Sequence, residues 1–403
     1  MNKKPRICFV TGGQLPVPDV LGGAVERLIT MLVEDNEKTE NFEFTVISKY
    51  NCDARTLQKK IRKTTFINLL PYNRVKNYFL WRYKRIVEYI TKKPHLYLAG
   101  TNRQIVNYLM KHGGEFDLII NECAHSLSLQ RVAEKYGTEK LCRHFHCIEK
   151  PFAGFENIYG FTISISEYVR MNFQKHTNIP CDKNYLLYNC VDEKRFQKAI
   201  SNEESASLRQ QFFFGKDDFV IFFCGRIVQE KGVKELMGAV KEVNDSHVKL
   251  LIAGSSNFAD GKTGSYEKEV KTLIKSMGDQ VKFTGFVDNS LIYKFHKIAD
   301  VIAIPSIWEE GFGLVIAESL ASGLPQIATI SGGMTEVGTE ETTIFIHKDH
   351  RLVQELANAI ITLKSNPDKV EAMQKACLQR ACMFYKGNYY QSFTTIVSKI
   401  LNS

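Results

Sequence analysis

Two glutamates, Glu310 and Glu318, stand close together in a segment rich in glycine and apolar residues, SIWEEGFGLVIAESLASGLP at 306–325. The segment predicts a loop that carries Glu310 and opens a helix that carries Glu318. Carboxylates accept strong hydrogen bonds from hydroxyl groups, so this pair is suited to gripping a sugar nucleotide. Glutamates are usually solvated, but the apolar residues 314–320 predict a buried helix start, where a carboxylate without a partner is costly.

Two cations, Arg226 and Lys231, follow a strand predicted at 218–225, in the sequence GRIVQEKG. Sheets of the α/β class bind ligands at the carboxyl ends of their strands, where fixed cations can neutralise the charge on a departing diphosphate. The alternative is that both are solvated surface charges. Because the chain contains no Asp-x-Asp pair, we expect the cations to act without a metal.

Four glycines surround the loop after the first predicted strand: Gly12 and Gly13 follow the strand, and Gly22 and Gly23 precede a helix from about Ala24. Glycine allows backbone amides to approach an anion, and a helix N-terminus favours negative charge. The alternative is an ordinary turn between a strand and a helix, since the spacing does not fit GxGxxG.

The segment CRHFHC brings Cys142, His144, His146 and Cys147 close together in sequence. Side chains alternate between the two faces of a strand, so the four cannot all converge on one ion, and we expect no metal site. His125 also follows a predicted strand and is a weaker candidate for a functional role.

Strands and helices alternate along the chain in two series, which is typical of doubly wound parallel sheets of the α/β class. The polar residues 197–216 separate the series, so we expect an acceptor-binding domain at 1–196 and a donor-binding domain at 197–386, with a ligand cleft between them. The last helix, from about Tyr389, is expected to return to the first domain as residues 387–403. The predicted strands are 6–11, 42–48, 117–121, 141–146 and 161–166 in the first series, and 218–225, 248–254, 281–285, 300–306 and 324–329 in the second.

Composition favours a cytoplasmic protein. The 403 residues include 44% hydrophobic and 24% charged residues and ten cysteines without a CxxC pair, as in reduced intracellular proteins. The N-terminal apolar stretch is too short for a secretory signal, and no apolar run approaches the ~18 residues of a membrane span.

Positive charge is concentrated at 59–93, where eleven Lys or Arg and one Glu give +10 against +9 for the whole chain. A helix over 76–90 would have an apolar arc, with aromatic and basic residues on the other side. Such a segment suits an anionic membrane surface or a lipid-linked acceptor. The alternatives are a helix packed on its sheet and, with no other support, a nucleic-acid contact. The acceptor or membrane candidates are Arg74, Lys76, Trp81, Arg82, Lys84 and Arg85.

Four motifs occur in the order found in retaining glycosyltransferases of family 4, which have the GT-B fold of two Rossmann-like domains, and the chain resembles that family over nearly its whole length. They are GGAVE at 22–26, YNCVDEKRF at 188–196, GRIVQEKG at 225–232 and the segment of paired glutamates, and SGGMTEV at 331–337 follows directly. The departures from the family pattern are Ser319, Ser322 and Cys190, and none removes a charged group.

The resemblance implies roles for particular residues. Glu318 would bind the ribose of the donor and Glu310 its sugar ring, while Arg226 and Lys231 hold the diphosphate and His146 faces the sugar. The remaining donor-binding candidates are Gly22, Gly23, the amides of Phe312, Gly313 and Leu314, and Phe286 and Val287 at the base.

The implied activity is transfer of a sugar, with retention and without a metal or cofactor, from a nucleotide-diphosphate donor, most simply a UDP-sugar, to a hydroxyl group. The basic segment favours a lipid-linked or polysaccharide acceptor in cell-surface polysaccharide synthesis, such as capsule or lipopolysaccharide. The alternatives are a small soluble acceptor and a non-catalytic protein that binds nucleotide sugars or glycans. We expect a monomer or weak dimer, either cytoplasmic or peripheral on the inner face of the membrane.

Overall fold

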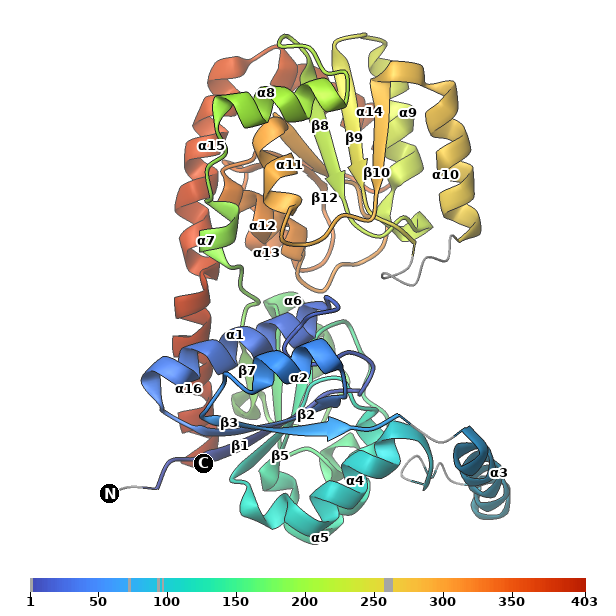
Figure 1. Ribbon diagram of the computed structural model, residues 1–403, viewed down its shortest axis with the longest axis vertical. Helices are drawn as coiled ribbons and strands as arrows, with labels where there is room; N and C mark the ends of the chain where they lie inside the picture. The colour runs from blue at the N-terminus through green and yellow to red at the C-terminus, as the bar shows by residue number, and fades with distance from the viewer. Residues whose placement is uncertain (1–2, 72–73, 93–94, 96–97, 257–263) are drawn as a thin grey trace. The chain divides into compact units, whose positions relative to one another are not determined.

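A computed structural model describes residues 3–71, 74–92, 95, 98–256 and 264–403. The chain folds into two units (Figure 1). The first contains residues 1–188 and 387–403, and the second contains residues 189–386. The boundary expected after residue 196 therefore falls inside the second unit.

The first unit is built on a seven-stranded parallel sheet of order β3-β2-β1-β4-β5-β6-β7. Its central strands are almost fully buried, because helices cover both faces of the sheet. The strands are β1 (Arg6–Val10), β2 (Glu43–Lys49), β3 (Thr64–Leu69), β4 (Leu118–Asn121), β5 (Leu141–Phe145), β6 (Phe161–Ser164) and β7 (Asn184–Leu186). The helices are α1 (Ala24–Thr39), α2 (Cys52–Gln58), α3 (Arg74–Thr91), α4 (Gly100–His112), α5 (Gln130–Tyr136), α6 (Glu167–Gln174) and α16 (Lys386–Leu401).

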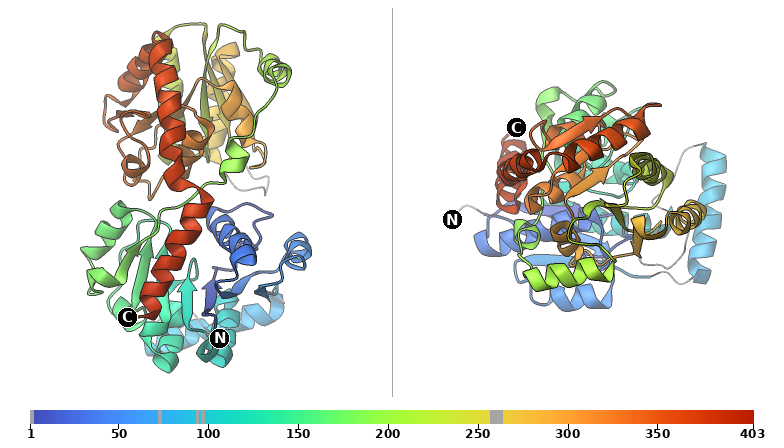
Figure 2. Two further views of the ribbon diagram at one scale, coloured as in Figure 1. Left: turned by 90° about the vertical axis from the view of Figure 1, so that its left-hand side faces the viewer. Right: turned by 90° about the horizontal axis from the view of Figure 1, so that it is seen from above.

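Helix α16 packs on the first unit although it ends the described chain (Figure 2). The ring of Phe393 lies 5.7 Å from Phe9, 5.9 Å from Phe42 and 6.2 Å from Phe44, measured between centroids. The hydroxyl of Tyr390 donates a hydrogen bond of 3.0 Å to the side-chain oxygen of Asn36 on α1. The first unit is therefore assembled from two segments that are far apart in sequence.

The second unit contains a six-stranded parallel sheet of order β10-β9-β8-β11-β12-β13. Its strands are β8 (Phe219–Cys224), β9 (Val248–Ala253), β10 (Val281–Gly285), β11 (Val301–Ile304), β12 (Gln326–Thr329) and β13 (Thr343–Ile346). Its helices are α7 (Glu193–Phe196), α8 (Asn202–Gln211), α9 (Val233–Val243), α10 (Ser265–Ser276), α11 (Ile292–Ile298), α12 (Leu314–Ser322), α13 (Met334–Val337), α14 (Leu352–Lys364) and α15 (Pro367–Ala381).

The expected α/β architecture of two doubly wound parallel sheets is confirmed, and all ten predicted strands are present. Three strands at sheet edges, β3, β7 and β13, lie outside the prediction. The polar stretch 197–216 is more ordered than a linker, because it contains α8, whose first turn is capped by a hydrogen bond of 3.1 Å from the amide of Glu204 to the hydroxyl of Ser201.

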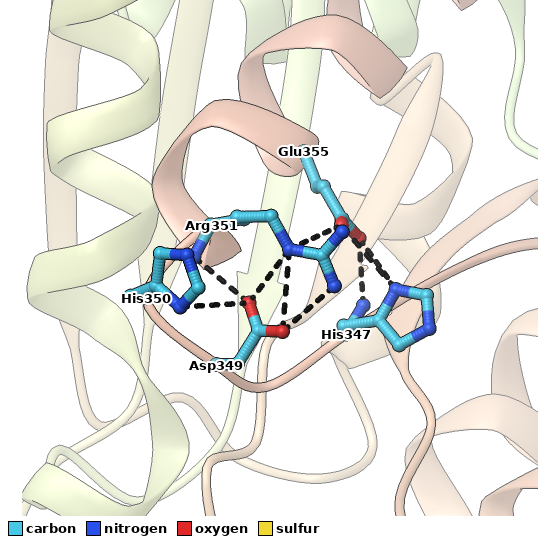
Figure 3. Close-up of polar contacts among 5 residues, drawn as sticks. All are labelled: His347, Asp349, His350, Arg351 and Glu355. Carbon is cyan, nitrogen blue, oxygen red and sulfur yellow. Dashed lines mark hydrogen bonds and ion pairs between the residues drawn. The ribbon is translucent and has the colours of Figure 1, made fainter.

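Polar contacts fix the loop between β13 and α14 (Figure 3). The carboxylate of Glu355, on α14, accepts a hydrogen bond of 2.7 Å from the amide of His347, just after β13. Asp349 accepts from the amide of Arg351 at 2.8 Å and forms an ion pair with its guanidinium at 2.7 Å. These short-range contacts hold one loop at the carboxyl edge of the second sheet.

Candidate active site

Each sheet has one point at which the strand order reverses direction, between β1 and β4 in the first unit and between β8 and β11 in the second. Doubly wound sheets bind ligands beyond the carboxyl ends of the strands at such a point. The residues that follow these four strands include Gly12, Glu122, Arg226 and Ser306. Among the predicted site residues, Gly22 and Gly23 follow β1, Arg226 and Lys231 follow β8, and Glu310 follows β11, so these five lie where the topology favours a ligand.

Glu310 is held by residues that follow three neighbouring strands. Its Oε1 atom accepts a hydrogen bond of 2.5 Å from the ammonium of Lys231, after β8, and one of 2.7 Å from the hydroxyl of Ser306, after β11. Its amide donates to the hydroxyl of Ser331, after β12, at 3.1 Å. Both charged side chains are mostly buried, with 24% of Lys231 and 16% of Glu310 exposed. This arrangement gives each group one preset position at the edge of the sheet.

Glycines allow the Glu310 loop to pack this closely. A Cβ atom on Gly332 would lie 2.1 Å from the carbonyl oxygen of Glu310, so no larger residue fits there. Gly313, which precedes α12, has a φ of +92°, and a Cβ atom there would lie 2.8 Å from Met334. The segment that carries the paired glutamates is thus fixed by its own backbone packing.

Glu318 lies on α12, where its Oε1 atom is 3.3 Å from the guanidinium of Arg195 on α7. The guanidinium carbon of Arg195 also lies 4.4 Å from the centroid of the Phe196 ring. Arg195 belongs to the motif YNCVDEKRF but was not among the predicted site residues. The contact orients the carboxylate of Glu318, which is 24% exposed and so remains accessible to a ligand.

Arg226 is exposed, and its guanidinium forms no hydrogen bond or ion pair with any residue of the described part of the chain. The backbone beside it is closely packed, because a Cβ atom on Gly254 would lie 1.8 Å from the carbonyl oxygen of Gly225. An accessible cation next to a fixed backbone is suited to binding an anion. Arg226 and Lys231 therefore differ, since only Lys231 already has a carboxylate partner.

The other predicted donor-binding residues of the second unit have different environments. Phe312 is 2% exposed and its ring meets Phe384 edge-on at 5.7 Å, so only its backbone could reach a ligand, as expected. Leu314 begins α12. Phe286, directly after β10, is 55% exposed, and Val287 is partly exposed. An exposed aromatic ring at a strand end is suited to stacking on a base, and this role stays a prediction.

In the first unit, Gly22 and Gly23 have positive φ angles of 78° and 104° before α1. A Cβ atom on Gly23 would lie 2.3 Å from a carboxylate oxygen of Glu26. Glu26 is 7% exposed, and burial raises its pKa. The N-terminus of α1 is therefore approached by a carboxylate of the chain itself, which competes with the anion expected there.

His146, just after β5, lies beside two residues that complete a buried cluster. Glu122 follows β4, and its Oε2 atom accepts hydrogen bonds from Nδ1 of His144 at 2.9 Å and from Nε2 of His146 at 2.6 Å. Burial raises the pKa of Glu122, but the interactions with His144 and then His146 outweigh it and lower the pKa to about 2. Burial, with the neighbouring His144, lowers the pKa of His146 to about 4. Glu122 is therefore ionised and His146 neutral near pH 7.

The four residues of CRHFHC do not come together, as expected from strand geometry. Cys142 is buried, and Cys147 is exposed and lies 3.7 Å from a carboxylate oxygen of Glu149. His144 and His146 do converge, and with Glu122 they offer three atoms within 4.8 Å of one another that could ligate a metal. Glu122 was not predicted, and the expected absence of a metal stays a prediction. His125 is exposed and lies outside this group.

Comparison with known proteins shows what this chain is similar to. Residues 204–380 match the family model for glycosyl transferases group 1. The chain is 29% identical over 249 residues to uncharacterized glycosyltransferase MJ1607 of Methanocaldococcus jannaschii, covering 61% of this chain and 56% of that protein. It is 28% identical over 378 residues to spore coat protein SA of Bacillus subtilis, covering 92% and 93%. A crystal structure of Anabaena Alr3699/HepE with UDP and glucose superposes with a TM-score of 0.72 at 20% identity, covering 98% and 99%.

The chain has the GT-B fold, and residues 204–380 are similar to group 1 glycosyl transferases. These matched residues contain Arg226, Lys231, Glu310 and Glu318, so they include the fixed carboxylates and the accessible cation described above.

The basic helix α3 presents its apolar arc outward rather than packing it on the sheet. Phe79, Tyr83, Ile86 and Ile90 are 64%, 56%, 56% and 72% exposed. Figures 1 and 2 show α3 at the margin of the first unit. The prediction of a helix is confirmed, whereas the alternative of a helix packed on its sheet through this arc is wrong.

The basic candidates on α3 differ from one another. Trp81 is 44% exposed, and Arg82 and Arg85 are exposed. Lys84 departs from the expectation of a free cation, because it is 7% exposed and its ammonium lies 3.0 Å from Glu88 and 4.7 Å from the centroid of the Trp81 ring. The side chains of Arg74 and Lys76 lie outside the described residues. Among the described residues, no helix combines the length and the apolar character needed to cross a membrane.

Acidification is expected to destabilise the second unit through His296 on α11. This imidazole is 2% exposed, and its Nδ1 atom donates to the hydroxyl of Ser322 at 2.8 Å. Burial, then Lys297 and Arg195, lower its pKa from 6.5 to about 3. The unfolded state therefore binds a proton at higher pH than the folded state. The free energy of unfolding falls as the pH drops from 6.5 towards 3, by up to about 1.4 kcal/mol per pH unit.

Urea unfolding at pH 7 and pH 5 tests this expectation with the variant His296→Asn, whose amide can replace Nδ1 as the donor. The variant should lose less stability than the wild type between the two pH values. His350→Asn is the matched control, because the His350 side chain is 88% exposed, and it should behave as the wild type. Equal losses in all three proteins would show that His296 does not titrate as described.

Proposed function

We propose that this glycosyltransferase moves a sugar from a nucleotide-diphosphate donor, a UDP-sugar in the first instance, to a hydroxyl group of a lipid-linked or polysaccharide acceptor, with retention and without a metal or cofactor, as a member of family 4. The observation that carries the proposal is the presence of two cations after the same strand. Arg226 is accessible, and Lys231 is already fixed beside Glu310. UDP as the nucleotide is supported by its presence in the solved structure of similar fold.

The proposed reaction balances without an added catalyst. The oxygen of the acceptor hydroxyl bonds to the anomeric carbon on the face from which the diphosphate leaves, and the bond from that carbon to the diphosphate oxygen breaks. The departing oxygen takes the proton of the hydroxyl. Arg226 and Lys231 stabilise the charge that develops on the diphosphate, Glu318 binds the ribose and Glu310 lies against the sugar.

A panel of UDP-, GDP-, ADP- and dTDP-glucose, measured by thermal shift and by slow hydrolysis without acceptor, tests the donor. A ligand at about 100 times its Kd stabilises the folded protein by about 2.7 kcal/mol, so one nucleotide should raise the Tm clearly. Glu318→Gln should remove that shift. Glu269→Gln, on α10, should keep it, because the 61% exposed Glu269 only pairs with Lys234. Binding without hydrolysis would favour the non-catalytic alternative, and neither binding nor hydrolysis would reject the proposal.

The lipid-linked acceptor is supported by α3. Its exposed apolar arc lies beside Arg82 and Arg85, and an anionic membrane attracts such a helix by about 1 kcal/mol per basic residue in addition to the buried apolar area. The glycosyltransferase should therefore cosediment with anionic phosphatidylglycerol vesicles more strongly than with phosphatidylcholine vesicles.

The triple variant Phe79→Ser, Ile86→Ser, Ile90→Ser should bind the anionic vesicles more weakly. Ile361→Ser is the control, since Ile361 is also an exposed apolar residue, 45% exposed, but lies on α14 of the second unit. No binding to anionic vesicles at low salt would favour a small soluble acceptor.

A further inference from the structure

Glu122 is a buried carboxylate whose place is set by the register of two strands. Asn121 of β4 pairs with Arg143 of β5, so the next residue along, Glu122, comes opposite His144. Its side chain is 3% exposed, and a single oxygen, Oε2, accepts from both imidazoles. An ionised carboxylate only accepts hydrogen bonds. The nitrogen of His146 that faces it, Nε2, must therefore carry a proton.

The other ring nitrogen of His146 is open. In the described part of the chain, Nδ1 of His146 has no hydrogen-bond partner and is not fully buried, and the side chain of His146 is 12% exposed. Solvent therefore reaches Nδ1. A neutral imidazole that donates through Nε2 has its lone pair on Nδ1, so His146 presents a hydrogen-bond acceptor to the outside of the sheet edge.

We propose that Glu122 is a positioning residue that holds the imidazole of His146 with Nε2 protonated, so that the Nδ1 lone pair accepts a hydrogen bond from a hydroxyl group of the sugar substrate. The inference rests on the proposed function, which supplies the sugar substrate whose hydroxyl group would donate to Nδ1.

The surroundings of Glu122 prevent its carboxylate from turning away. The guanidinium of Arg143 donates to the backbone carbonyl oxygens of Asn121 and Glu122 at 3.2 Å and 3.0 Å, and to Glu149 at 2.6 Å. His144 donates to the oxygen that His146 uses. The backbone and the carboxylate are thus both held, and the orientation of the His146 ring is set before a substrate binds.

Nitrogen-15 NMR of the imidazoles tests the tautomer without any substrate. The signal of His146 is assigned by comparison with His146→Gln. In the wild type near pH 7 it should show a neutral ring with the proton on Nε2. In Glu122→Gln, whose amide can either accept or donate, the two tautomers should both be populated. A wild-type His146 that carries its proton on Nδ1 would overturn the inference.

Steady-state kinetics with the donor identified by the panel tests the consequence. Because a hydrogen bond to a charged group is stronger than one between neutral groups, Glu122→Gln should lower kcat about ten- to a hundredfold, with little change in the KM of the donor. Glu115→Gln is the matched control, because Glu115 also accepts from a histidine, His112, at 2.8 Å, but it lies before β4, at the opposite end of the strand from Glu122, and it should keep full turnover.

Three further outcomes separate the inference from the proposed function. If no donor is turned over by the wild type, the proposed function fails while the NMR result still decides the role of Glu122 on the ring. If His146→Gln turns over normally, the role of Nδ1 is overturned. If the purified protein contains stoichiometric zinc that Glu122→Gln lacks, Glu122 is a metal ligand, and the inference is wrong.

Discussion

Replacing both Arg226 and Lys231 by alanine is expected to lower sugar transfer by about four orders of magnitude or more. Removing one preorganised donor to a developing anion costs about a hundred- to a thousandfold in kcat. In this structure Lys231→Ala should lower turnover further, because Glu310 loses the 2.5 Å contact that fixes it. The measurement is the turnover of the donor identified by the panel, with thermal melts to show that the variant is folded.

The single variants separate the two contributions. Arg226→Ala removes a cation without a partner in the described chain, so it should leave the melting temperature unchanged while it lowers turnover. Lys234→Ala is the control: Lys234 lies 2.5 Å from Glu269 and follows Lys231 closely, but it is not at the end of a strand. Wild-type turnover in the double variant would exclude the assignment of these cations to the leaving group.

Phe393→Ala should destabilise the first unit by about 3–5 kcal/mol, the usual effect of removing a buried phenylalanine from a core. Phe393 is 2% exposed, and its ring packs against three aromatic rings of the first sheet and its flank. Hydrogen exchange during urea unfolding measures the effect, and the amides of β1 and β2 should lose protection at lower urea than in the wild type.

Thr395→Ala, on the exposed side of the same helix, is the control. It should change the urea unfolding of neither the first unit nor the second. The amides of β8 and β9 should unfold as in the wild type in both variants. An equal loss of protection in the second unit after Phe393→Ala would mean that α16 does not stabilise the first unit specifically.

Most strands that the sequence predicts correctly have apolar residues on both faces, such as β4 and β8. The three that it missed are edge strands, although a fourth edge strand, β10, was predicted. β7 has three residues, and β3 lies inside a segment in which lysines and arginines dominate. Edge strands bury less apolar surface, so their composition resembles that of loops and gives little periodic signal.

The residues of the candidate site also divide into those that could be predicted from the sequence and those that could not. Lys231 and Glu310 could be named because each follows an apolar strand, but their ion pair spans 79 positions in sequence and depends on the order of the strands. Glu122 has no local signal, since one glutamate after a strand is commonplace. Its role becomes visible only when β4 is placed beside β5 in the observed register. Arg195 was not predicted as a site residue, because α7 and α12 are far apart in the chain.

The two-segment construction of the first unit also determines the order of events during synthesis. The ribosome completes residues 189–386 before it makes residues 387–403. The second unit can therefore fold while the first still lacks Phe393 and Tyr390 and keeps the rings of Phe9, Phe42 and Phe44 only partly covered. The unit that is translated first is the last to be finished, and in the interval its exposed aromatic surface is a target for chaperones.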